Sequence, residues 1–370
     1  MNNWHKHALF KIESDYQRSS DTHLLEVRLP NSSPVSLFLK DESTHPTGSL
    51  KHRLARSLFL YGLCNGYIRE GTTIVEASSG NTAVSEACFA QMLGLRFIAV
   101  VPEGTSSEKV EKIALFGGEC HFVPPKDIYS EAARLAADSG GYYMDQFTNA
   151  ERATDWRGNN NIAESIFSQI CCESPSVPSW IVVSAGTGGT ASTIGRFIRY
   201  KSHATRLCVA DPSNSVFFDY YRTGDATLVS ESSSRVEGIG RPRVEPSFNC
   251  AVVDRMMKVP DAAAYATLPF LERILGRRCG GSTGTNVYAA LQLMAELKEQ
   301  GEPASVVSMI CDGGERYQDT YYDDAWLASE GADLTPYTRQ LETFYETGSW
   351  EAFSSEVLDC PSDQRHYKLD

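Results

Sequence analysis

Lys51 lies in a segment whose residue types suit covalent chemistry. It follows the run Pro46-Thr47-Gly48-Ser49-Leu50, in which proline and glycine predict a turn and Ser49 suits the start of a helix. Because the helix dipole is positive at that end, a lysine in the first turn is unfavourable there unless its amine has a function. A solvated surface lysine is the plain alternative, and the loops further along the chain decide between the two.

Two later loops have the composition of anion sites, and each is expected between a buried strand and a helix. Residues 78–82 offer hydroxyl groups and helix N–H groups that suit a carboxylate, although an ordinary capped turn has the same residue types. Residues 186–190 are rich in glycine but lack the lysine of a P-loop and the spacing of a dinucleotide site. They predict a cup for a single phosphate group, for which a glycine-rich turn alone would be weak support.

Two further loops belong with them, at residues 281–286 and 312–317, although an N-cap explains the first equally well. In parallel sheets ligands bind at the carboxyl ends of strands, where all these loops are expected. A lysine, a monophosphate cup and a carboxylate pocket together indicate pyridoxal phosphate acting on an amino acid, because lysine forms a Schiff base with the cofactor aldehyde.

Strands alternate with helices along the chain, which predicts an α/β fold with right-handed crossovers and parallel sheets flanked by helices. We expect an N-terminal domain at residues 1–150, a second α/β domain at 151–325 and a C-terminal helical extension at 326–370. Residues 150–161 are expected to be irregular, and residues 222–250 to form a long loop. Strands are expected at residues 35–40, 73–77, 97–101, 121–123, 142–144, 180–183, 206–210 and 305–311. Helices are expected at residues 49–61, 83–93, 108–116, 128–137, 191–200, 262–275 and 287–298.

Composition narrows the class of protein. The chain has 370 residues and a net charge of -13, which argues against nucleic acid or an anionic membrane as a partner. No apolar run reaches membrane-spanning length, and the first residues lack the apolar core of a signal peptide. Ten cysteines are scattered without metal-ligand spacing, so we expect reduced thiols, no metal and a cytoplasmic protein.

Seven short motifs, in their joint order and spacing, resemble a known family. They cover roughly residues 10–325 and resemble the cysteine synthase and cystathionine β-synthase branch of the fold-type II PLP enzymes, the tryptophan synthase β family. The motifs are Pro46-Thr47-Gly48-Ser49-Leu50-Lys51, Ser78-Ser79-Gly80-Asn81-Thr82, Gln146-Phe147-Thr148-Asn149, Gly186-Thr187-Gly188-Gly189-Thr190, Glu237-Gly238-Ile239-Gly240, Ser282-Thr283-Gly284 and Gly314-Glu315-Arg316-Tyr317.

The resemblance implies a role for each candidate site residue. Lys51 would be the Schiff-base lysine and the base for the Cα proton, Asn81 would bond the 3'-oxygen of the cofactor, and Ser282 would face its pyridine nitrogen. A neutral serine there suits β-elimination through an aminoacrylate. The phosphate would be wrapped by Gly186, Thr187, Gly188, Gly189 and Thr190. The substrate would be held by Ser78, Ser79, Gly80, Thr82 and Gln146, with Gly238 at the substrate entrance.

Several positions depart from the pattern of cysteine synthases and look more like bacterial L-cysteine desulfhydrases. His52 follows the lysine where relatives usually have Asp, and Ala83 and Gly313 replace a usual glycine and serine. The leading hypothesis is therefore elimination from L-cysteine to sulfide, pyruvate and ammonia by a cytoplasmic homodimer. The alternatives are a cysteine synthase or related β-replacement enzyme, and a catalytically silent PLP-binding regulatory partner. Serine or threonine dehydratase is disfavoured by the asparagine-containing and phosphate loops.

Overall fold

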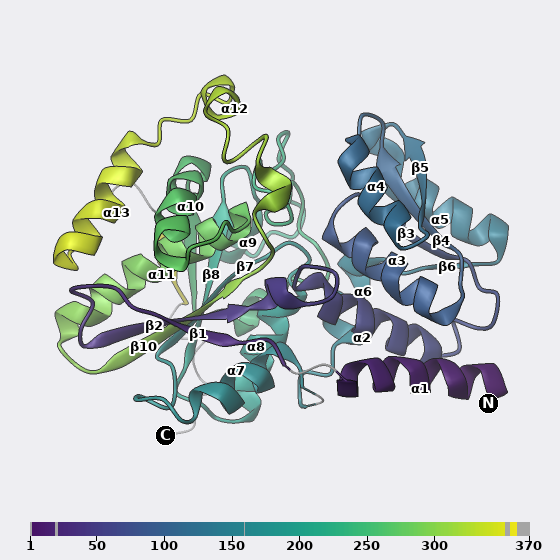
Figure 1. Cartoon of the computed structure of the whole chain (residues 1–370), viewed down its shortest axis with the longest axis horizontal. Coiled ribbons are helices and arrows are strands. Elements are labelled where there is room, and N and C mark those ends of the chain that lie inside the picture. The colour runs from purple at the N-terminus through teal and green to yellow at the C-terminus, as the bar shows by residue number, and fades with distance from the viewer. Residues whose placement is uncertain (1, 19–20, 159, 352–355, 361–370) are drawn as a thin grey trace. The chain divides into compact units, whose positions relative to one another are not determined.

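The computed structural model describes residues 2–18, 21–158, 160–351 and 356–360 (Figure 1). The chain divides into two compact units. Unit 1 consists of Met1–Asp21 and Thr44–Asp155, and unit 2 consists of Thr22–Ser43 and Trp156–Asp370. Within the described residues, no helix combines the length and apolar composition that a membrane crossing needs.

Unit 1 contains a four-stranded parallel sheet with the strand order β5-β4-β3-β6. Its strands are β3 (Ile74–Ala77), β4 (Phe97–Pro102), β5 (Glu119–Val123) and β6 (Tyr142–Tyr143). Its helices are α1 (Asn3–Arg18), α2 (Lys51–Cys64), α3 (Asn81–Leu93), α4 (Ser107–Leu115), η2 (Pro125–Asp127), α5 (Ile128–Ser139) and α6 (Gln146–Ala153). Alternate residues of β3 face opposite sides: Ile74 packs with α2 and α3, whereas Val75 and Ala77 pack with α5.

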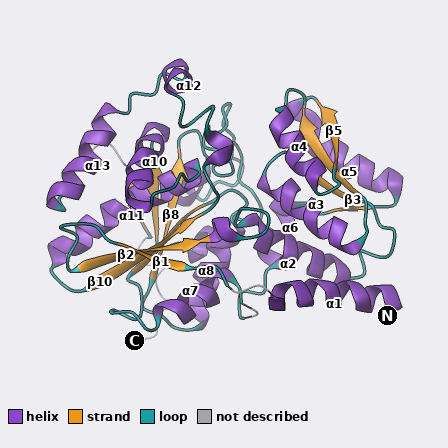
Figure 2. Cartoon of the chain, viewed as in Figure 1, coloured by secondary structure: helices purple, strands orange, loops and turns teal. Residues whose placement is uncertain are grey.

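Unit 2 contains a seven-stranded sheet with the order β1-β2-β10-β7-β8-β9-β11. Strands are drawn in orange in Figure 2. The five inner strands are parallel, and the two edge strands β1 and β11 pair antiparallel with their neighbours. The strands are β1 (Leu24–Val27), β2 (Val35–Asp41), β7 (Trp180–Ser184), β8 (Arg206–Pro212), β9 (Arg255–Val259), β10 (Ala304–Ile310) and β11 (Val357–Asp359). The helices are η1 (Glu42–Thr44), α7 (Ile162–Ile170), α8 (Gly189–Tyr200), α9 (Phe217–Thr223), η3 (Cys250–Val252), α10 (Asp261–Leu275), α11 (Gly281–Gln300), η4 (Glu315–Tyr317), α12 (Asp324–Ser329) and α13 (Thr335–Thr347).

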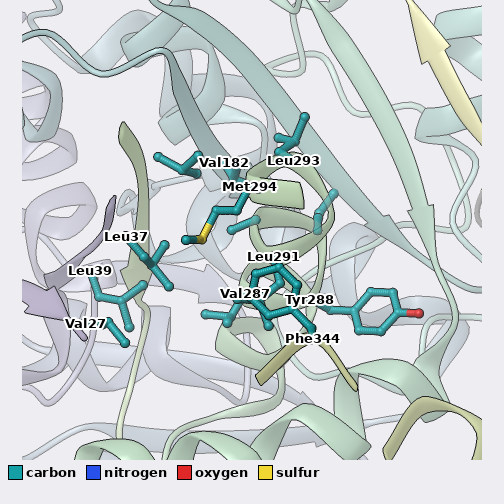
Figure 3. Close-up of a cluster of buried hydrophobic side chains, with 14 of the residues drawn as sticks. Val27, Leu37, Leu39, Val182, Val287, Tyr288, Leu291, Leu293, Met294 and Phe344 are labelled. Atoms are coloured by element: carbon teal, nitrogen blue, oxygen red, sulfur yellow. The ribbon is translucent and has the colours of Figure 1, made fainter. Parts of the chain in front are cut away.

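The main core of unit 2 surrounds α11, whose first fifteen residues are all buried. Apolar side chains from the sheet, including Leu37, Leu39 and Val182, lie around Leu291 and Met294 of this helix (Figure 3). Because a helix that is buried on nearly all sides cannot shift without opening cavities, α11 holds the residues at its own N-terminus in a fixed position.

The division of the chain differs from the expected boundary at residue 150. Residues 22–43, expected in the N-terminal domain, belong to unit 2, because β2 pairs in parallel with β10 along its whole length. The C-terminal extension is part of unit 2 as well, with Phe344 in the main core and Trp326 against an aromatic cluster. It also contains the strand β11, which was not expected, and residues 352–355 and 361–370 of the extension lie outside the described residues.

The expected strands and helices are found within a few residues of their predicted bounds. Two expectations were wrong at their edges. Residues 150–153 are the end of α6 and not irregular chain, and α11 begins at Gly281, so that residues 281–286 are its first turns. The helices α1, α6, α7 and α9 and the strands β1, β9 and β11 were not predicted.

Truncation of Val182 tests the importance of this core. Val182 is 0% exposed, so Val182→Ala is expected to lower the free energy of unfolding by about 2 kcal/mol through lost burial and the cavity left behind. Val229 is 76% exposed in the same unit, so Val229→Ala should change it by less than about 0.5 kcal/mol. Denaturant unfolding of both variants measures the difference, and equal losses would contradict the packing described.

Candidate active site

Lys51 is the first residue of α2 and follows a tight turn. Gly48 has φ +75°, a conformation that favours glycine, and its N–H donates to the His45 carbonyl at 2.7 Å. The Ser49 hydroxyl accepts from the Lys51 N–H at 3.3 Å, although the helix itself begins two residues later than the predicted start. The structure therefore places Lys51 in the first turn of a helix, as predicted.

A side-chain network ties this turn to the start of α3. The Thr47 hydroxyl lies 2.9 Å from the Ser85 hydroxyl and 3.2 Å from Nδ1 of His52. His52 is buried and stacks on His45, with ring centroids 5.1 Å apart. The sequence marked His52 only as a departure from relatives, and the partners Thr47 and Ser85 were missed as a network because they are 38 residues apart.

Residues 78–82 connect β3 to α3, as the sequence predicted. Gly80 is the N-cap of α3 and has no side chain with which to cap the helix, and Asn81 and Thr82 are its first two residues. Ser78 and Ser79 precede it, and the Ser78 hydroxyl accepts from the Gly80 N–H at 3.2 Å. The first N–H groups of a helix have no partner within the helix and carry its positive dipole, so this end of α3 suits a carboxylate.

Gln146 reaches this loop from a distant part of the sequence. It is the first residue of α6, is 4% exposed, and its Oε1 accepts from the Thr82 hydroxyl at 2.8 Å. Because that oxygen is bonded to Thr82, the amide nitrogen of Gln146 is the atom that can donate to a substrate carboxylate. The structure thus brings Gln146 and Thr82 together.

Residues 186–190 lead from β7 into α8. Gly188 has φ +88°, and a Cβ there would lie 2.5 Å from the Phe248 Cα. A Cβ on Gly186 would lie 2.2 Å from the Gly238 carbonyl oxygen. Both positions therefore require glycine because neighbouring backbone approaches closely, in addition to any need of a phosphate. Gly188 is also the N-cap of α8, so the buried first turn of this helix has no side-chain cap from that residue.

The segment that contains Gly238 packs against the same loop. The Gly240 N–H donates to the Ala185 carbonyl at 2.8 Å. The Tyr321 hydroxyl accepts from the Glu237 N–H at 2.8 Å and donates to the Arg235 carbonyl at 3.0 Å. The structure therefore fixes Gly238 beside the phosphate-loop candidate. Tyr321 was missed in the sequence, where nothing distinguishes it from other tyrosines of the last segment.

Ser282 is the second residue of α11 and is buried. The neighbouring Thr283 hydroxyl accepts from the Cys311 N–H at 3.1 Å, just beyond the end of β10. Since β10 and β7 are parallel neighbours, Ser282 and residues 186–190 lie at the same edge of the sheet in unit 2. Within the described residues, no cluster of three or more His, Cys, Asp or Glu side chains could hold a metal ion.

Each unit thus holds one set of candidate residues. Unit 1 contains Lys51, Ser78, Ser79, Gly80, Asn81, Thr82 and Gln146. Unit 2 contains Gly186, Thr187, Gly188, Gly189, Thr190, Gly238 and Ser282. A glycine cradle at the N-terminus of α8 and a buried neutral hydroxyl at the start of α11 fit the phosphate and the ring nitrogen of pyridoxal phosphate.

Comparison with known proteins agrees with this chemistry. Residues 19–312 match the family model described as "Pyridoxal-phosphate dependent enzyme", and the chain belongs to this family, with pyridoxal 5'-phosphate as its cofactor. It is 57% identical over 352 residues to L-cysteine desulfhydrase Cds1 of Mycobacterium tuberculosis, covering 94% of this chain and 96% of that protein. It is 30% identical to cysteine synthase B of Campylobacter jejuni, covering 77% of this chain and 91% of that one.

The fold also agrees with a solved relative. The crystal structure of O-ureido-L-serine synthase matches with a TM-score of 0.72 and 27% identity, covering 83% of this chain and 96% of that one. The α/β fold with parallel sheets flanked by helices is therefore that of the fold-type II PLP enzymes, as the motifs predicted.

Substitution of Gly188 tests the phosphate cradle. Gly188→Ala is expected to weaken binding of pyridoxal phosphate at least about tenfold, because the new Cβ must displace the Phe248 backbone and deform the loop. Gly224 has a similar φ of +73° but open space around it, so Gly224→Ala controls for backbone strain alone. Equilibrium titration of both apoproteins with cofactor gives the two affinities, and equal affinities would contradict the assignment of the cradle.

Proposed function

We propose that the chain is an L-cysteine desulfhydrase, which converts L-cysteine and water into sulfide, pyruvate and ammonia. The C–S bond breaks with loss of the Cα proton, sulfide leaves with the bonding electron pair, and water then replaces the amino group on Cα. The observation that carries this proposal is the likeness to the mycobacterial L-cysteine desulfhydrase over nearly the whole length of both chains. Cysteine synthases are more distant relatives.

We propose a role in cofactor binding for each of the following residues. Lys51 would hold the aldehyde carbon through its amine, Asn81 the 3'-oxygen and Ser282 the ring nitrogen. The phosphate would be bound by the N–H and hydroxyl groups of Gly186, Thr187, Gly188, Gly189 and Thr190. Support comes from the helix N-terminus and glycine cradle of this loop, and from the position of Lys51 in the first turn of α2.

When bound, pyridoxal phosphate supplies a conjugated ring that stabilises negative charge at the substrate Cα. The amine of Lys51 would take the Cα proton as a general base. Ser282 would offer the ring nitrogen a neutral hydroxyl. This suits elimination, because negative charge at the substrate Cα is lost as sulfide departs and needs less stabilisation by the ring. The substrate carboxylate would bind the N–H groups at the start of α3, the hydroxyls of Ser78, Ser79 and Thr82, and the amide of Gln146, with Gly80 giving backbone access.

A β-replacement enzyme is the second candidate, because synthases stand among the relatives and solved neighbours. Both activities share substrate binding, removal of the Cα proton and loss of the β-substituent. They differ in the next step, in which either water hydrolyses the elimination product or a second nucleophile adds to it. Holoenzyme incubated with L-cysteine alone should release sulfide and pyruvate in a 1:1 ratio. Turnover of O-acetylserine only when sulfide is added, with cysteine as the product, would reject the desulfhydrase in favour of the synthase.

We further propose a cytoplasmic homodimer. The dimer follows from the family resemblance, and the cytoplasm is supported by the ten cysteines, each of which is a free thiol in the structure. The mass of one chain is 40.8 kDa, so light scattering should give twice that value for the holoenzyme. A mass of one chain would reject the dimer.

Replacement of Lys51 tests its proposed double role. Lys51→Ala should remove both the covalent attachment and the base, lowering sulfide release at least about a thousandfold, within the range that general-base and covalent catalysis contribute. Lys126 is an exposed lysine of the same unit, and Lys126→Ala should keep parental activity. The absorbance of bound cofactor and the rate of sulfide release give the two readouts. Parental activity in Lys51→Ala would refute the assignment.

A further inference from the structure

Four buried polar side chains, one of which belongs to residues 78–82, form one cluster. Glu76, Thr82, Glu86 and Gln146 are 0%, 3%, 0% and 4% exposed. Two of them are carboxyl groups, which rarely lie fully inside a protein unless something holds them there. The family motifs account for Thr82 and Gln146 and give no role to Glu76 or Glu86.

Glu76 anchors the backbone that carries Gln146. It lies in β3 between Val75 and Ala77, whose side chains face α5. The side chain of Glu76 therefore points to the opposite face of the sheet. Its Oε1 accepts from the Ala77 N–H at 2.7 Å and its Oε2 accepts from the Gln146 N–H at 3.1 Å. One carboxyl group therefore joins the end of β3 to the first residue of α6.

The chain needs such an anchor just before Gln146. Asp145 has φ +45°, in the left-handed region that non-glycine residues seldom adopt. Its side chain caps α6 by accepting from the Thr148 N–H at 3.3 Å. The hydrogen bond from the Gln146 N–H to Glu76 fixes the backbone on the C-terminal side of Asp145. In this position Oε1 of Gln146 accepts from the Thr82 hydroxyl.

Glu86 approaches the same carboxyl group from α3. It stands four residues after Thr82, so both lie on one face of the helix. The Glu86 carboxyl group faces that of Glu76, and neither of its buried oxygens has a hydrogen-bond donor in the part of the chain that the structure describes. Two facing carboxyl groups can hydrogen-bond to each other when one of them is protonated. Because Glu76 accepts from two backbone N–H groups, Glu86 is the better place for that proton.

Other groups around the pair do not favour its ionisation. Asp145 precedes α6, Tyr142 and Tyr143 stand on β6, and Tyr129 of α5 faces Tyr143. The neighbouring strand β4 has no titratable residue. Burial raises the pKa of both carboxyl groups above the usual range of a glutamate, and the charge of Glu76 raises the pKa of Glu86 further.

We propose that the buried Glu76–Glu86 pair is the positioning device of the amino-acid carboxylate site, fixing Gln146 against Thr82 without touching the substrate. Glu76 is the acceptor that holds the backbone of Gln146, and Glu86 is the protonated donor that holds Glu76. The inference rests on the proposed function in one respect: residues 78–82 and Gln146 are taken as the carboxylate site.

The first experiment needs no substrate and compares wild-type holoenzyme with Glu86→Gln, which keeps a neutral donor of the same shape. A carboxyl group whose pKa is raised by folding stabilises the protein at low pH, and this contribution is lost as pH rises through the folded pKa. From pH 7 to pH 10 the unfolding temperature of wild type should therefore fall more steeply than that of Glu86→Gln, which has one buried proton fewer to lose. All other titrating groups are shared, so equal slopes would overturn the protonated Glu86.

The second experiment separates positioning from simple stability. In Glu76→Gln one side-chain oxygen becomes a donor, so either Ala77 or Gln146 loses its acceptor. KM should then rise about tenfold, whereas kcat should stay within about threefold, since the reacting groups are untouched. Glu86→Leu removes the donor and should also raise KM about tenfold. Glu86→Gln keeps a donor, so its KM should stay close to that of the wild type.

A merely structural pair would lower the unfolding temperature in Glu76→Gln and Glu86→Leu and leave KM at the parental value, which would overturn the inference. KM is measured with whichever amino acid the wild-type holoenzyme turns over. If the enzyme turns over O-acetylserine only when sulfide is added, the desulfhydrase proposal is refuted, but KM for O-acetylserine still tests the pair.

Discussion

The N–H groups at the starts of α3 and α8 are the constraint on which the candidate site depends. Both helices begin with a glycine N-cap, which has no side chain to accept from them. Their first turns are largely buried, and at α8 the Thr187 hydroxyl accepts from the Gly189 N–H at 3.2 Å. An anion satisfies such an end in hydrogen bonding and in charge. We propose that the phosphate of pyridoxal phosphate binds at the start of α8 and the carboxylate of the amino acid at the start of α3.

The rest of each unit keeps those helix ends in place. In unit 2 the buried helix α11 holds Ser282, and the Thr283–Cys311 bond ties its start to the end of β10. In unit 1 the Thr47 hydroxyl joins the turn before Lys51 to α3, while Glu76 joins β3 to α6. The chemical groups thus lie on helix starts and strand ends, which are more rigid supports than free loops.

The alternation of strands and helices and the positions of Lys51, Asn81 and residues 186–190 were predictable, because they follow from local residue patterns. Long-range pairing was not. Nothing local shows that β2 pairs with β10, more than 260 residues later, and so belongs to unit 2 (Val35 pairs with Ala304). His52, Glu76 and Glu86 likewise gain their meaning from partners on other elements. Glu76 has one local signal in the sequence, since it is a charged residue within an otherwise apolar strand.

The most direct test of the account is to find which lysine carries the cofactor. Holoenzyme is treated with borohydride, which makes the lysine–cofactor bond permanent, then digested and mapped by mass spectrometry. We predict a single modified residue, Lys51, at the start of α2. Modification of Lys40, which is fully buried on β2, or of any other lysine would contradict the assignment of Lys51.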